Sequence, residues 1–109
     1  MKKTLTFDVE LDENQLPLSI EMREGDSQKI ESGIKALMIS AWSAKSRETL
    51  RIDLWTKDMP VNEMFIMYHQ TMIGMANTLK TATGHDKLAG ALLDYCDFFA
   101  NETKIKKVE

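Results

Sequence analysis

The sequence predicts an α+β fold, a four-stranded antiparallel meander sheet followed by two C-terminal helices. Two observations carry this prediction. Apolar residues recur at every second position in the first half of the chain, which is the period of a strand with one face in water. In the second half they recur with the period of helices, and the change falls within residues 49–64.

The first two predicted strands form a hairpin. Residues 5–11 place four apolar side chains at alternate positions, namely Leu5, Phe7, Val9 and Leu11. A polar turn at 12–15 leads to a return strand at 16–22, where Pro17 marks an edge position or the first residue, because proline cannot donate to a ladder. Residues 23–33 are polar and rich in glycine, which predicts a loop, with or without one helical turn.

The third and fourth predicted strands follow this loop. Residues 34–42 are apolar on both faces, as expected of a central strand. Residues 49–55 place Leu50, Ile52 and Leu54 on one face, with Arg51 and Asp53 on the wetter one. Four strands in chain order are most simply joined as a meander.

Two helices are predicted after the strands, at about 59–82 and 86–101. Asp58 and Pro60 are suited to begin the first helix, as a capping acid and as a residue whose φ is already helical. Its apolar arc is wide, which implies burial on two sides, and the sheet could cover one of them. Gly84 is expected to end this helix in the left-handed conformation. We expect both helices to pack on one face of the sheet.

Composition limits the class of protein. The chain has 109 residues, which fits a single domain at 1–109, with a flexible basic tail at 103–109. A net charge of −3 argues against nucleic acid as a partner, and no apolar run approaches the roughly 20 residues that membrane insertion requires. Asp8 and Glu10 interrupt the apolar stretch of any signal peptide, so we expect an uncleaved start. A single cysteine, Cys96, cannot form an internal disulfide, which favours the cytoplasm.

No set of residues with catalytic or metal-binding spacing is visible. His69 and His85 lack partners at ligand spacing, and Cys96 adjoins an apolar helix stripe, as a small buried residue would. Asp94 and Asp97 share a helix face, which a solvated polar stripe explains. The glycines stand singly, so there is no phosphate-binding loop. The sequence predicts no enzyme, no cofactor and no metal.

Surplus apolar surface predicts self-association. Five of the eight methionines lie on or beside the first helix, where methionine fills either a core or an adaptable binding surface. Two helices cannot easily cover this helix and both faces of the strand at 34–42, so we expect a homo-oligomer, most simply a symmetric dimer. The interface candidates are Met38, Trp42, Trp55 and Met67. Edge pairing, face packing and a different protein partner all remain open.

Four segments carry a resemblance to a known family: LDEN at 11–14, TLRIDLWTKDMPV at 49–61, YHQT at 68–71 and DYCDFFA at 94–100. Together they resemble the GldC family of gliding-motility proteins of Bacteroidetes. The resemblance implies a small cytoplasmic accessory protein of gliding motility and type IX secretion, with protein partners and no enzymatic residues. We therefore expect a non-enzymatic adaptor or assembly factor.

A second similarity concerns topology alone. Antiparallel strands followed by two helices are also the order of elements in SecB-type export chaperones, although no SecB sequence motif is present. The alternative function is therefore a SecB-like holdase that binds unfolded clients. A shared fold helps to rank hypotheses about function but does not establish one.

Overall fold

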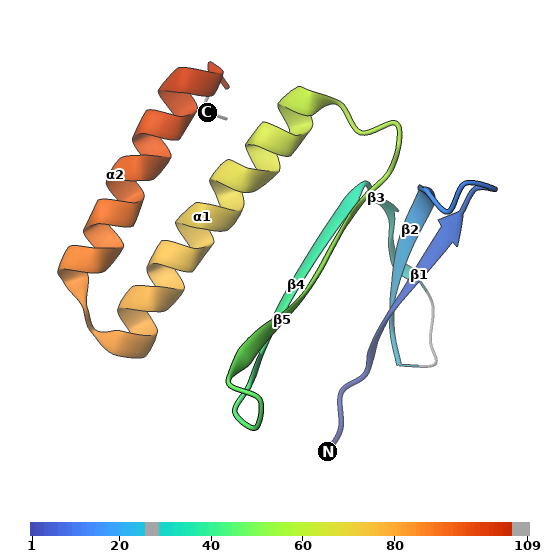
Figure 1. Cartoon of the computed structure of the whole chain (residues 1–109), viewed down its shortest axis with the longest axis horizontal. Coiled ribbons are helices and arrows are strands. Elements are labelled where there is room, and N and C mark those ends of the chain that lie inside the picture. The colour runs from blue at the N-terminus through green and yellow to red at the C-terminus, as the bar shows by residue number, and fades with distance from the viewer. Residues whose placement is uncertain (26–28, 106–109) are drawn as a thin grey trace. The chain divides into compact units, whose positions relative to one another are not determined.

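A computed structural model describes residues 1–25 and 29–105. The chain divides into two compact units, Met1–Met59 and Pro60–Glu109. The strands of the described residues lie in the first unit and the helices in the second (Figure 1). The α+β class, with antiparallel strands followed by two C-terminal helices, is confirmed. The prediction of a single domain remains a prediction.

The first unit contains a three-stranded antiparallel sheet in the order β1 (Leu5–Leu11), β2 (Pro17–Glu24), β3 (Lys29–Ile34). Its register aligns apolar residues across the sheet, with Val9 opposite Ile20 and Ile20 opposite Ile34. Ile20 is 0% exposed, so the best-buried point of this unit lies on the central strand. In the turn between β1 and β2, the Asp12 carboxylate accepts the backbone N–H groups of Asn14 and Leu16.

A separate two-stranded antiparallel ribbon follows, formed by β4 (Ala36–Ser43) and β5 (Glu48–Trp55). Eight successive residue pairs join the two strands without a register shift, from Ala36 opposite Trp55 to Ser43 opposite Glu48. Both other strand pairs, in contrast, carry irregularities. The ribbon is therefore the most regular strand pair of the described chain.

The prediction of one four-stranded meander is wrong in its detail, because the described residues form five strands in two sheets. The extra strand, β3, occupies much of the predicted loop at 23–33, and Ile34 ends it instead of beginning the next strand. A polar segment can form an edge strand because its backbone groups pair with β2, without requiring apolar side chains. Residues 26–28 of the predicted loop lie outside the described residues.

The second unit is a helical hairpin of α1 (Val61–Thr83) and α2 (Asp86–Thr103). Gly84 ends α1 with φ +70°, and its N–H donates to the carbonyl of Lys80 at 2.8 Å, which confirms the predicted left-handed cap. At the start of α2 the Nδ1 atom of His85 accepts the N–H of Leu88 at 3.1 Å. Pro60 occupies the capping position of α1 without a side-chain hydrogen bond, so the predicted capping role of Asp58 is wrong.

Small side chains form the buried part of this hairpin, namely Ala76 on α1 with Ala89 and Cys96 on α2. Towards the open end, the ring of Phe99 meets Phe65 edge to face at 6.0 Å and stacks on His69 at 6.5 Å. Small residues allow two helices to approach closely, and aromatic rings fill the wider part. The prediction that the helices cover one face of a sheet remains a prediction.

Candidate interaction surface

One face of the ribbon is apolar over three of its residue pairs, before the polar pair Ser43 and Glu48 next to the turn. The register pairs Leu37 with Leu54, Ile39 with Ile52, and Ala41 with Leu50. We call these six residues the apolar ribbon face. Leu50 is 58% exposed and Ile52 51% exposed, whereas Leu37, Ile39 and Leu54 are half-buried. Apolar exposure is therefore greatest toward the hairpin turn.

The opposite face carries three of the four predicted interface residues. Trp55 lies opposite Ala36, Met38 opposite Asp53, and Trp42 opposite Thr49. We call the face that holds Trp42, Met38 and Trp55 the tryptophan face. Trp42 is 61% exposed and Trp55 55% exposed, while Met38 is half-buried. Both tryptophans are therefore more open than a role in the core would require.

Charged side chains lie between the tryptophans. The Arg51 guanidinium donates from Nη2 to Asp53 Oδ1 at 2.7 Å and from Nε to Asp53 Oδ2 at 3.2 Å. Its Nη1 also donates to the Ser40 hydroxyl at 2.7 Å. Near the turn, the Arg47 guanidinium lies 6.0 Å from the ring of Trp42. The tryptophan face thus combines aromatic rings with a paired Arg and Asp, a mixture typical of protein interfaces.

Met67, the fourth predicted interface residue, lies half-buried on α1 in the helical unit. Whether it shares a surface with the other three remains a prediction. The helical unit has exposed apolar residues of its own, including Tyr95 and Phe98, whose ring centroids are 5.8 Å apart. Leu88 is also exposed, because the buried stripe of α2 is centred on Ala89 and Cys96.

A polar network fixes the base of the ribbon where β5 ends. Thr56 is almost fully buried, and its N–H donates to the Lys35 carbonyl at 2.8 Å. Its hydroxyl donates to Asp58 Oδ1 at 2.7 Å, and Lys35 Nζ donates to Asp58 Oδ2 at 3.1 Å. Hydrogen bonds from Thr56 and Lys35 lower the pKa of Asp58 below its usual value. Asp58 therefore ties the end of β5 to the residue that separates β3 from β4.

A second link joins this base to the β1–β2 turn. Lys57 donates from its backbone N–H to the Pro17 carbonyl at 3.1 Å and from Nζ to Asp12 Oδ2 at 2.8 Å. The hydrogen bond from Lys57, together with those from the N–H groups of Leu16 and Asn14, lowers the pKa of Asp12 to about 2. Both links serve the architecture, because every group in them is already paired.

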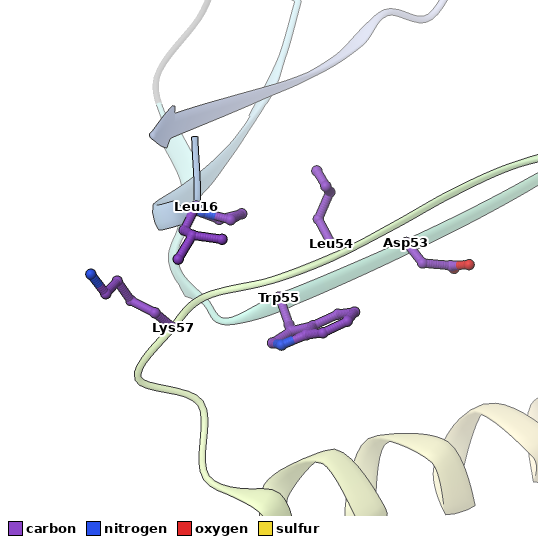
Figure 2. A pocket seen from close by; sticks show the side chains of 6 residues that line it. Leu16, Asp53, Leu54, Trp55 and Lys57 are labelled. Atoms are coloured by element: carbon purple, nitrogen blue, oxygen red, sulfur yellow. The ribbon is translucent and has the colours of Figure 1, made fainter. Parts of the chain in front are cut away.

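A small apolar hollow of about 280 Å³ lies beside this base (Figure 2). It is lined by Leu16, Pro17, Asp53, Leu54, Trp55 and Lys57. Leu54 and Trp55 point to opposite sides of β5, as the period of a strand requires. Its two charged residues are engaged elsewhere, Asp53 with Arg51 and Lys57 with Asp12. The hollow therefore offers no unpaired acid or base for catalysis.

The residues that could have carried chemistry lie apart and have structural surroundings. Cys96 is buried, and burial raises the pKa of its thiol, which disfavours the reactive thiolate. His69 stacks on Phe99, His85 caps α2, and Asp94 and Asp97 are exposed on α2. Among the described residues, no three His, Cys, Asp or Glu side chains are grouped as metal ligands would be. None of the described helices combines the length and apolarity needed to cross a membrane.

The comparison with protein-family models matches residues 17–105 to the model described as gliding motility-associated protein GldC-like. The chain belongs to the GldC-like family. This confirms the resemblance carried by the segments at 49–61, 68–71 and 94–100, all of which fall within the match. Membership links the chain to gliding motility, and the GldC-like family is not known as an enzyme family. No curated protein and no solved structure matched the chain.

Sequence reasoning missed the exposed part of the apolar ribbon face. Leu50 and Ile52 were predicted to line one face of a strand, and that alternation is correct, but neither was among the predicted interface residues. No sequence signal could have found them, because their exposure follows from the separation of the ribbon from the other strands, which only the structure shows. A strand pair outside the three-stranded sheet has fewer neighbours to cover its apolar side chains.

Proposed function

We propose that this GldC-like protein is a non-enzymatic cytoplasmic adaptor or assembly factor of the gliding-motility and type IX secretion machinery, and that it acts through protein–protein contacts. The observation that carries the proposal is the ribbon, which presents an apolar face on one side and two exposed tryptophans on the other. Clustered exposed apolar and aromatic side chains on a regular scaffold are typical of surfaces that bind protein.

Family membership and site chemistry support this proposal from two directions. The family description concerns gliding motility, which is a process of assembled protein machinery. In the described chain the titratable groups of the hollow and of the ribbon base are already engaged in structural pairs. The cytoplasm is supported by the lone cysteine, which is buried with a free thiol.

The experiment replaces the gene in a gliding bacterium with a Leu50→Asp variant and measures both colony spreading and the proteins that co-purify with the tagged chain. Leu50 is more than half exposed, so a carboxylate there should leave the fold intact while preventing an apolar contact. We expect spreading to be lost together with one defined partner. Val61→Asp, an equivalent change at an exposed residue at the start of α1, is the control and should behave as wild type. Normal spreading with an unchanged set of partners in the Leu50→Asp strain would overturn the proposal.

The SecB-like holdase remains the second proposal, favoured by the same exposed apolar residues and by the order of strands and helices. A holdase binds many unfolded chains, whereas an adaptor binds one defined partner. Suppressing the aggregation of an unrelated unfolded protein at equimolar ratio tests this difference. Broad suppression that Leu50→Asp abolishes favours the holdase, and no suppression by the wild type rejects it.

A further inference from the structure

The outer edge of β5 is the starting observation. β5 pairs with β4 on one side, and no other strand of the described residues pairs with it on the other. It is eight residues long, contains no proline, and keeps a regular register with β4 throughout. A long regular edge of this kind is a template for another strand, because its outward N–H and C=O groups have no ladder partner.

We propose that β5 pairs antiparallel with β5 of a second copy of this chain, with Ile52 on the two-fold axis. Leu50 then lies opposite Leu54 of the second copy, Arg51 opposite its Asp53, and Thr49 opposite its Trp55. Two ribbons become one four-stranded antiparallel sheet. This inference rests on the proposed role of the ribbon as an interaction surface, and it names the partner of the ribbon edge.

The pattern of faces limits the possible registers. Leu50, Ile52 and Leu54 of β5 belong to the apolar ribbon face, whereas Arg51, Asp53 and Trp55 belong to the tryptophan face. A shift of one residue would place apolar side chains of one copy beside the charged face of the other, since successive residues point to opposite sides. The registers that keep both faces continuous therefore differ from one another by two residues. Each such step moves the two-fold axis by one residue along β5.

Charge favours one register over its two neighbours. With Ile52 on the axis, the Arg51–Asp53 pair of each copy lies opposite the reversed pair of the other copy, so each charge also faces one of opposite sign across the strands. Moving the axis to Arg51 would place two guanidinium groups opposite each other, and moving it to Asp53 would place two carboxylates opposite each other. Opposite charges across a strand pair are stabilising and like charges are destabilising. The spacing of Arg51 and Asp53 around Ile52 is therefore self-complementary under two-fold symmetry.

The edges of β4 and β1 do not offer the same selection. β4 contains no charged residue, so charge would not distinguish its self-pairing registers. The β1 edge carries Asp8 and Glu10. Centring a two-fold axis between them, on Val9, would place acid opposite acid. Of the edges of β1, β4 and β5, that of β5 is the one whose charges favour a second copy of itself.

The test of association uses two charge-reversal variants of the full chain, measured by light scattering after size exclusion over a hundredfold dilution. Arg51→Asp leaves two acids, and Asp53→Arg leaves two arginines, so each alone should weaken the dimer by roughly ten- to hundredfold in Kd. Mixing the two variants should restore a dimer, because opposite charges then face each other. The double variant R51D/D53R should also dimerise as the wild type does. Lys45→Asp, in the exposed turn, is the control for charge reversal away from the edge.

The test of register uses single cysteines in a Cys96→Ala background under mild oxidation. Ile52→Cys should form a disulfide-linked dimer by itself, because residues on a two-fold axis face their own copies. Leu50→Cys and Leu54→Cys should each fail alone and cross-link when mixed. Circular dichroism establishes that each variant is folded.

Several outcomes would overturn the inference. A wild-type mass of 12.5 kDa at every concentration rejects the dimer. A dimer that survives both single charge reversals, or a cross-link at a different pairing of cysteines, rejects this edge and register. These measurements use purified protein without any motility component. The self-pairing inference can therefore fail while the adaptor proposal stands, and the adaptor proposal can fail in cells while the dimer forms.

Discussion

Truncating Ile20 to alanine tests where the core of the strand unit lies. Ile20 is 0% exposed at the centre of the three-stranded sheet, opposite Val9 on one side and Ile34 on the other. The change removes three carbon atoms from a site with no contact with water. At about 0.8 kcal/mol per buried carbon the lost transfer energy is about 2.4 kcal/mol, and the cavity left behind raises the cost to about 3 kcal/mol.

The shift in melting temperature follows from the size of the chain. For 109 residues, the entropy of unfolding is about 0.23 kcal/mol/K, so a loss of about 3 kcal/mol lowers Tm by about 13 °C. Leu18→Ala is the matched control, because it also removes three carbon atoms from β2, at a side chain that is 44% exposed. We expect that variant to lose about 1 kcal/mol, or about 4 °C.

Two probes in the thermal unfolding assay report on different units. Trp42 and Trp55 lie in the strand unit, so tryptophan fluorescence follows its unfolding, whereas helical circular dichroism follows α1 and α2. If the chain is one cooperative domain, both signals shift together in Ile20→Ala. If only the fluorescence transition moves, the two units unfold independently and the single-domain prediction is wrong. Equal shifts for Ile20→Ala and Leu18→Ala would refute the assignment of Ile20 to the core.

Two further predictions concern local contacts. Because the pKa of Asp12 falls from 3.8 to about 2 on folding, its stabilising effect is complete above about pH 4 and is lost as the pH falls through about 2. Urea titrations should therefore show a smaller acid-induced loss of stability in Asp12→Asn than in the wild type. Identical pH profiles of the two proteins would contradict the link to Lys57. Gly84→Ala should destabilise the chain by about 1 kcal/mol, because Gly84 has φ +70°. Gly90→Ala should stabilise it by about 0.5–1 kcal/mol, because it removes a glycine from the interior of α2 where the added methyl group meets no other atom. Urea midpoints of the two variants that move in the same direction would contradict this assignment.

The alternation and helix signals were sufficient to predict most of the elements. β1, β5 and both helices fall close to their predicted bounds, because each carries a strong period or a distinct end signal such as Gly84. β3 was missed because an edge strand can be polar when its backbone is paired. The sequence also offered no means to separate one sheet from two, since Lys35 alone divides β3 from β4.

The candidate surface was predictable only in part. Trp42, Met38 and Trp55 were correctly placed on strands, and the register brings them to one face of the ribbon. Their exposure depends on how many neighbours the ribbon has, which is a property of tertiary structure and not of local pattern. Asp58 was predicted to cap α1, but a short carboxylate can bind any nearby donor, and here Lys35 and Thr56 are the donors that lie within reach.

The ribbon poses a physical problem that the proposed pairing resolves. A two-stranded hairpin is marginally stable in water, and the polar links through Thr56 and Lys57 hold it only at its base. Its far end exposes Leu50 and Ile52 on an edge that could accept any strand, which is a risk of uncontrolled aggregation. Charges on an edge strand normally reduce that risk by repelling neighbours. Arg51 and Asp53 reduce the risk differently, because they carry opposite charges and lie symmetrically about Ile52. They favour self-pairing with Ile52 on the two-fold axis and disfavour the two neighbouring registers.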